Sequence, residues 1–148
     1  MATVRRRCAA SRDAVWSVLA DPWLYPSWVV GASRIRTVEG RWPDVDAVIH
    51  HSVGVWPLLL NDTTSVVESV PGTRLGLRAR GWPLGEADVV VELEDDAGGC
   101  LVTMREWAVR GPGTLVPAPV FEPVVHWRNV ESLRRLALIA QGRGAAEE

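Results

Sequence analysis

Lysine is absent from the 148-residue sequence, and all 16 basic residues are arginine. The 18 acidic residues outnumber them, which gives a formal net charge of −2 at pH 7. Proteins that hold nucleic acid through its phosphate backbone usually carry an excess of positive charge. The composition therefore predicts no nucleic-acid partner.

Cysteine is almost as rare, because only Cys8 and Cys100 occur. Two thiols without the close spacing of a zinc motif predict no metal site, and we expect both to be free in a reducing cytoplasm. Residues 1–8 carry positive charge but no apolar run follows them, so no signal peptide is expected. Since no stretch approaches about 18 uninterrupted apolar residues, no membrane span is expected either.

The sequence motifs of several large enzyme classes are also missing. There is no GxSxG elbow, no P-loop, no GxGxxG and no HExxH. The sequence therefore lacks the motifs of serine hydrolases with a nucleophile elbow, of nucleotide-binding proteins and of zincins. We predict no cofactor.

Apolar residues make up 47% of the chain, enough for the core of one domain over residues 1–148. Ser11 is a good N-cap for a helix at 11–21, and the aromatic, proline-containing segment at 21–29 predicts a second short helix or compact turn. Segments with β-branched or alternating apolar residues, separated by Gly-, Pro- or Asp-rich turns, predict strands at 2–9, 32–40, 46–54, 58–70, 73–81, 86–96 and 99–110.

The last part of the sequence predicts a loop followed by one long helix. Four prolines and two glycines at 111–123 argue against regular structure there. A helical period runs from about Glu122 to Gln141, and the tail at 142–148 is expected to fray. Steps of about 100° place His126 and Asn129 on the apolar side of this helix and Arg128 on the other. The centre of the apolar side is formed by Val130, Leu133, Leu136, Ala137 and Ala140.

Sequential strands with short turns favour an antiparallel sheet, so the predicted class is α+β, with one long helix covering the sheet. The order of elements and four strings resemble the START/Bet v1-like (SRPBCC) superfamily, and within it the bacterial polyketide cyclase/dehydrase-like proteins. These strings are AVWSVLADPWLYPSWVVG, HHSVGVWP, VTMREWAVRGPG and HWRNVESLRRLA. The resemblance implies a helix-grip fold, in which a seven-stranded curved antiparallel sheet wraps around the C-terminal helix and encloses a cavity. It also implies an apolar small-molecule ligand, polyketide-like or lipid.

Two adjacent histidines lie on the strand predicted at 46–54. Because side chains alternate between the faces of a strand, His50 and His51 must point to opposite sides and cannot bind one metal ion together. Ile49, His51 and Val53 form the more apolar set, so we expect His51 inside and His50 outside. A shift of one residue in the strand register would reverse this assignment.

The strand predicted at 99–110 carries Glu106 on an otherwise apolar face, which the resemblance places toward the interior. A buried carboxylate is costly unless it is paired or neutralised, and the expected polar neighbours are His51, His126 and Asn129. Two interpretations stay open. The cluster orients a ligand or moves a proton, with His51 and Glu106 as catalytic residues, or it is a buried network that ties helix to sheet.

Inward positions on the expected strands and helices give a candidate lining for the cavity. They are Trp28, Ile49, Val53, Leu77, Val89, Val91, Met104, His126, Asn129 and Leu133. Three functions remain open: binding of an apolar small molecule, a polyketide aromatase/cyclase that uses His51 and Glu106, and a protein-interaction module, which an exposed apolar patch would favour. The sequence does not decide between a monomer and a homodimer.

Overall fold

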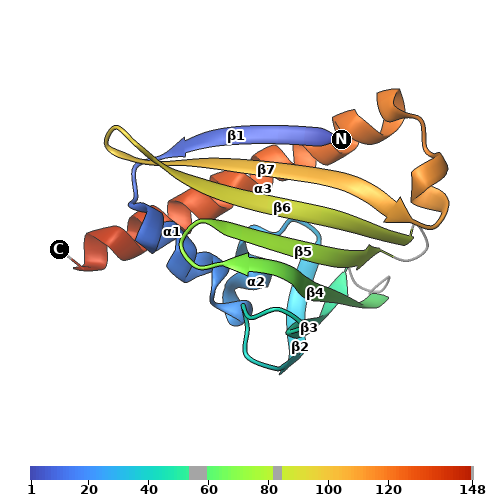
Figure 1. The fold of residues 1–148 in the computed structure, drawn as a ribbon, viewed down its shortest axis with the longest axis horizontal. Coiled ribbons are helices and arrows are strands. Elements are labelled where there is room, and N and C mark those ends of the chain that lie inside the picture. The colour runs from blue at the N-terminus through green and yellow to red at the C-terminus, as the bar shows by residue number, and fades with distance from the viewer. Residues whose placement is uncertain (54–59, 82–84, 148) are drawn as a thin grey trace.

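The computed structural model describes residues 1–53, 60–81 and 85–147, which form a seven-stranded antiparallel sheet and a set of helices (Figure 1). The strand order is β1-β7-β6-β5-β4-β3-β2, so the first strand lies beside the last. Figure 1 shows β2 running across the direction of β6 and β7, which means that the sheet is strongly bent. The strands are β1 Ala2–Cys8, β2 Ala32–Glu39, β3 Val48–Val53, β4 Leu60–Val70, β5 Arg74–Gly81, β6 Gly85–Asp96 and β7 Gly99–Arg110.

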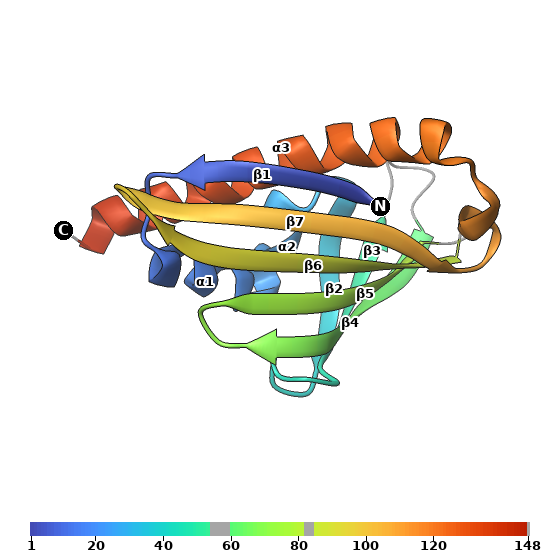
Figure 2. The ribbon, with the colours of Figure 1, turned by 45° about the horizontal axis from the view of Figure 1, so that its top comes forward.

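Helices cover the concave side of this sheet. The long helix α3 packs along β1 and β7, and α1 and α2 contact it from the other side (Figure 2). The helices are α1 Arg12–Leu19, the 3₁₀ helix η1 Pro22–Leu24, α2 Tyr25–Trp28, the 3₁₀ helix η2 Pro112–Leu115 and α3 Ala118–Glu147. In the described part of the chain, no helix combines the length and hydropathy needed to cross a bilayer. The predicted helix-grip fold is confirmed.

The start of α1 follows the predicted capping pattern. The Ser11 hydroxyl accepts a hydrogen bond from the backbone N–H of Ala14 at 3.1 Å, which satisfies one of the free donors of the first turn. Asp21 caps η1 in the same way, since its carboxylate accepts from the N–H of Trp23 at 3.0 Å. These two caps mark the starts of α1 and η1.

The predicted boundaries of the last helix are wrong. The proline-rich segment at 111–123 forms η2 and the first turns of α3, and the helix continues to Glu147 through the tail that was expected to fray. Prolines are tolerated near a helix start because the first turn has no acceptors for its N–H groups. Here the carbonyl of Pro117 accepts from the N–H groups of Val120 and Phe121, and Pro123 is accommodated inside the helix.

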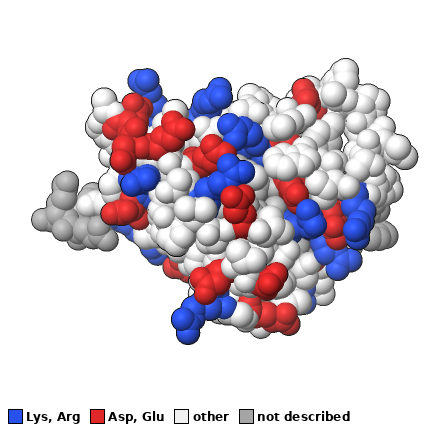
Figure 3. All heavy atoms as spheres, viewed as in Figure 1, with Lys and Arg blue, Asp and Glu red and all other residues white. Residues whose placement is uncertain are grey.

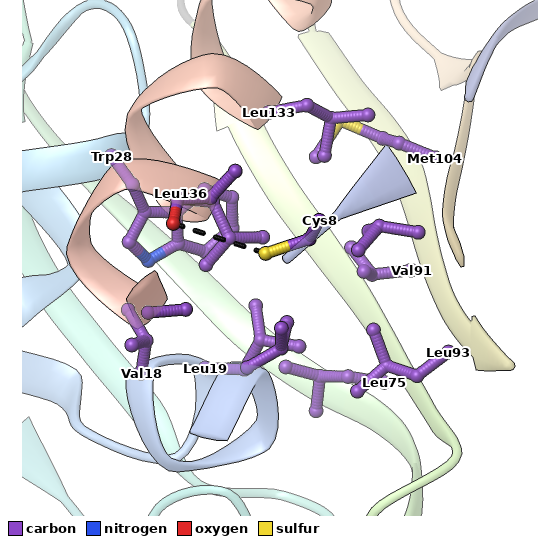
Figure 4. Packing of buried hydrophobic residues seen from close by; sticks show 14 of the residues in the cluster. Cys8, Val18, Leu19, Trp28, Leu75, Val91, Leu93, Met104, Leu133 and Leu136 are labelled. Carbon is purple, nitrogen blue, oxygen red and sulfur yellow. Dashed lines mark hydrogen bonds between the residues drawn. The ribbon is translucent and has the colours of Figure 1, made fainter. Parts of the chain in front are cut away.

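The core lies between the concave side of the sheet, α1 and the second half of α3 (Figure 4). On β6, Val91 and Leu93 are buried while the intervening Glu92 points outward, as the alternation predicts. On the outer face, the Glu92 carboxylate accepts from Arg74 at 2.5 Å and from Arg105 at 2.6 Å. The largest fully buried side chains are those of Leu19, Ile49, Leu75, Leu77, Leu93, Leu133, Leu136, Val15, Val18, Val66, Val91 and Thr64.

Both cysteines belong to this core. Cys8 and Cys100 are direct partners in the β1–β7 ladder, and both thiols are free and buried. Burial raises the pKa of the Cys100 thiol, so little of the reactive thiolate is present at neutral pH. We expect the native protein to react with Ellman's reagent at least about 100-fold more slowly than the chain unfolded in guanidinium chloride. Rapid reaction of the native protein would contradict this packing.

Candidate functional site

A cavity of about 380 Å³ lies between the sheet, α2 and the first half of α3. Its wall is mostly apolar and includes Trp28, Leu77, Val89 and Met104. The lining reaches the surface beside η2 and the first turns of α3, where Val120 and Val124 line the cavity and are also exposed. A space of this size and chemistry is typical of small-molecule sites.

Tyr25, Thr64 and His51 form a first polar group in the wall, which we call the hydroxyl–imidazole cluster. The Thr64 hydroxyl lies 2.9 Å from Nε2 of His51 and 3.1 Å from the phenolic oxygen of Tyr25. The Tyr25 and His51 rings are stacked at a tilt, with centroids 5.5 Å apart. All three side chains are buried, so α2, β3 and β4 together hold a chain of three hydrogen-bonding groups against the cavity.

Burial makes this cluster electrically neutral. Desolvation lowers the pKa of His51, and the charges of nearby Asp62 and Arg36 push it in opposite directions. Desolvation also raises the pKa of Tyr25, against the smaller opposing effect of its hydrogen bond to Thr64. At neutral pH the imidazole is therefore uncharged and able to accept a proton, and the phenol keeps its proton.

The lowered pKa of His51 makes stability depend on pH. The unfolded chain takes up a proton at this residue near pH 6.5, while the folded protein resists it until lower pH. The stabilisation is therefore complete above about pH 6.5 and is lost as the pH falls below it toward the folded pKa. Between about pH 7.5 and 5.5, urea midpoints should fall more steeply for the wild type than for His51→Gln.

His50→Gln is the matched control for this measurement. The imidazole of His50 lies on the opposite face of β3, 3.2 Å from a carboxylate oxygen of Glu39. We expect this variant to keep the slope of the wild type. Equal slopes in all three proteins would show that His51 does not stay neutral in the folded state.

Glu106, Arg128 and Asn129 form a second polar group, which we call the carboxylate cluster. Oε2 of Glu106 on β7 accepts from Nη2 of Arg128 and, at 2.9 Å, from Nδ2 of Asn129, both on α3. Glu106 and Asn129 are buried, whereas the Arg128 side chain is 38% exposed. A cation and an amide thus compensate the buried carboxylate and join the helix to the sheet.

The two clusters lie on different elements around an apolar space. Among the described residues, Oε1 of Glu106 has no hydrogen-bond partner, so it can accept from a ligand. The arrangement suits a molecule with an apolar body and at least two oxygen functions. Within the described ranges, no group of three or more His, Cys, Asp or Glu residues is placed to hold a metal ion.

Comparison with known proteins gives the family. A family model described as polyketide cyclase / dehydrase and lipid transport matches residues 1–141. The chain belongs to this family. The match confirms the resemblance noted in the sequence, and the family supports binding of a hydrophobic ligand or a polyketide cyclase role. A search of curated proteins gave no match.

Solved structures share the fold of the polyketide cyclase/dehydrase family at low sequence identity. The di-domain ARO/CYC StfQ of the steffimycin biosynthetic pathway is 15% identical, with a TM-score of 0.71 over 97% of this chain and 51% of its own. Ara h 8.0201 is 12% identical, with a TM-score of 0.73 over 95% and 96% of the two chains. CV1439 from Chromobacterium violaceum is 16% identical, with a TM-score of 0.69 over 93% and 94%. These similarities show the fold alone.

Several residues expected in the site do line the cavity of this family member. They are Trp28, His51, Leu77, Val89, Met104, Glu106 and Asn129. Ile49, Val91 and Leu133 instead lie in the core and are not part of the cavity wall. The side chain of Val53 lies outside the described residues.

The prediction that His126 faces the cavity is also wrong. His126 is exposed and lies in a separate shallow groove between the start of α3 and residues 1–3. The predicted neighbourhood of His51 and Glu106 must also be corrected, because the hydrogen-bond partner of His51 is Thr64 and those of Glu106 are Arg128 and Asn129.

Sequence reasoning missed Tyr25, Thr64 and Arg128. Tyr25 is the only tyrosine and lies in the aromatic string near the start, which was a usable signal. Thr64 gives no signal in the sequence, because its contact with His51 depends on the pairing of β3 with β4. Arg128 was placed on the side of the helix away from the sheet, but its side chain is only 38% exposed and its guanidinium reaches the buried Glu106.

Proposed function

We propose that the chain binds an apolar small molecule with at least two oxygen functions, polyketide-like or lipid, in the cavity. The observation that carries this proposal is a cavity of about 380 Å³ whose apolar wall is interrupted by the hydroxyl–imidazole and carboxylate clusters. Apolar contact supplies affinity, and the few polar groups orient the ligand. We place this function in the cytoplasm, where the free thiols of Cys8 and Cys100 would persist.

Ligand binding can be followed without any label, because Trp28 is part of the cavity wall. We expect hydroxylated fused-ring aromatics or fatty acids to change the intrinsic fluorescence. A ligand at about 100 times its Kd should stabilise the fold by about 2.7 kcal/mol, which raises Tm by about 5–10 °C. Such compounds should be screened by thermal melts and then titrated by fluorescence.

The decisive test of the binding site is a variant that fills the cavity. Ala108 lines the cavity, so Ala108→Phe should weaken binding at least about 10-fold while the fold is kept. Ala97 lies exposed in the turn between β6 and β7, and Ala97→Phe adds the same volume without touching the cavity. Equal affinity of the two variants, or a panel without any binder, would refute the proposed site.

A second candidate function is cyclisation or dehydration of a polyketide in the same cavity. It is favoured by a protonated phenol at Tyr25, a neutral imidazole at His51 and an open carboxylate oxygen at Glu106. A phenol can polarise a ketone while the imidazole or carboxylate removes a proton from the adjacent carbon, and loss of a β-hydroxyl as water then gives an enone. No nucleophile is needed for this chemistry.

This candidate is tested with a β-hydroxyketone that gains absorbance when it dehydrates. Glu106→Gln and Tyr25→Phe preserve shape, so they should keep ligand binding within about threefold and lose turnover by about 100-fold or more. Unchanged turnover in both variants, or a wild-type rate equal to that in buffer, would leave binding as the function.

A further inference from the structure

Four large apolar side chains stand exposed beside the mouth of the cavity. Leu115 is 84% exposed, Val120 59%, Val124 65% and Trp127 69%. We call these four residues the apolar ridge. Exposed apolar residues that gather at one place mark a surface that is covered during function, because leaving them in water is unfavourable.

The ridge is built by the local geometry of η2 and α3. Positions 120, 124 and 127 are spaced i, i+4 and i+7, so they lie on one face of the helix. The opposite face of the same turns is also apolar and points inward, with Val125 buried. Farther along α3 the outward side instead carries Glu131 and Arg134, which pair at 2.8 Å. The first turns of α3 are therefore apolar on both sides.

The side chains of the ridge carry no charge. Within the sequence at 111–127, Glu122 is the only residue with a formal charge at neutral pH, and its carboxylate pairs with the N-terminal ammonium at 2.8 Å, while the neighbouring Arg128 pairs with the buried Glu106. Figure 3 shows few charged atoms at the upper right, where the first turns of α3 lie, whereas positive and negative groups are mixed over the sheet. A partner that covers the ridge is thus held by apolar contact and not by charge.

Hydrogen-bonding groups are equally scarce on this surface. The ridge side chains offer one polar group, the indole N–H of Trp127, and the intervening Pro117, Pro119 and Pro123 have no backbone N–H. A protein–protein interface makes roughly one hydrogen bond per 100–200 Å². A bilayer needs none from the inserted side chains, and it accommodates tryptophan at its interface, where the ring is buried and the N–H is solvated. The chemistry of the ridge therefore fits a lipid surface better than a protein.

The ridge is also the rim of the cavity. Val120 and Val124 line the cavity and belong to the ridge, so a ligand that enters or leaves there passes over apolar side chains. We propose that the apolar ridge docks on the surface of an uncharged lipid bilayer and that the cavity exchanges its ligand directly with the bilayer. The exchange rests on the proposed function, but the docking does not.

The test is flotation of the full chain with phosphatidylcholine vesicles that contain no added ligand. We expect the wild type to float with the vesicles to the same extent at about 50 and 500 mM salt, because no charge is involved. Val124→Ser/Trp127→Ser should lower the partition coefficient at least about 10-fold. Trp23→Ser and Leu138→Ser are the controls, because they remove exposed apolar side chains outside the ridge and should float like the wild type.

Three outcomes would overturn the docking. They are an absence of flotation, equal flotation of the ridge variant, and binding that requires anionic lipid and disappears in high salt. Analytical ultracentrifugation tests for a dimer. If the wild type forms a dimer and does not bind vesicles, and if the ridge variant is a monomer, then the partner of the ridge is a second copy of the chain and not a bilayer. Ligand affinity is measured separately, by titration in buffer without vesicles. Flotation without any ligand affinity refutes the proposed function alone, and affinity without flotation refutes the docking alone.

Discussion

Arg128→Met should lower the free energy of unfolding by about 2 kcal/mol, although the arginine is partly exposed. Methionine keeps the apolar stem but removes the charge, which leaves the buried carboxylate of Glu106 with Asn129 as its remaining donor. Removing one partner of a fully buried pair costs about 3–5 kcal/mol, and the exposure of Arg128 and the remaining amide reduce that figure. Urea melts monitored by circular dichroism measure the difference.

Arg134→Met is the matched control on the same helix. Arg134 pairs with Glu131 at the surface, and exposed pairs of this kind contribute little, so we expect a change below about 0.5 kcal/mol. Adding Glu106→Gln to Arg128→Met removes the uncompensated charge and should restore about half of the loss. If the Arg128 and Arg134 variants prove equally stable, the ion pair to Glu106 does not contribute to the fold.

His51→Ala should cost about 1–3 kcal/mol of unfolding free energy, because it removes a buried ring and leaves the Thr64 hydroxyl without its imidazole partner. The same change should weaken ligand binding, since the hydroxyl–imidazole cluster lies in the cavity wall. Denaturant melts and fluorescence titrations of one preparation give both quantities.

His50→Ala is the internal comparison, one position away on the same strand. Its side chain points to the other face of β3, toward the exposed Glu39, so the expected change is no more than about 0.5 kcal/mol. If His50→Ala is the damaging change and His51→Ala is silent, then β3 is paired in the other register and the cluster does not exist.

Much of the fold could be predicted because its signals are local. The alternation in β6 distinguishes the buried Val91 and Leu93 from the outward Glu92. In β7 the same period puts Glu106 on the face of Met104, and the family resemblance assigned that face to the interior. Ser11 marks the start of α1 through its own hydrogen bond. Each of these features depends on residues a few positions apart.

The site was harder to predict because its contacts join distant segments. Tyr25 meets Thr64 across 39 positions, and Arg128 meets Glu106 across 22, so neither pair leaves a local pattern. The position of α3 over the sheet decides whether Arg128 reaches Glu106, and a helical projection treats the helix alone. His126 was misplaced for the same reason. It lies in a groove beside residues 1–3, and a projection of the helix alone does not include the start of the chain.

The pairing of β1 with β7 has a consequence for how the chain folds. Ala2 lies opposite Glu106 and Cys8 opposite Cys100, so β1 has no ladder partner until about 100 further residues have been made. Closing so long a loop is entropically costly, whereas the other ladders join strands that follow one another in the sequence. We therefore expect β1 to join the sheet late, after β3 to β7 have assembled through their short connections.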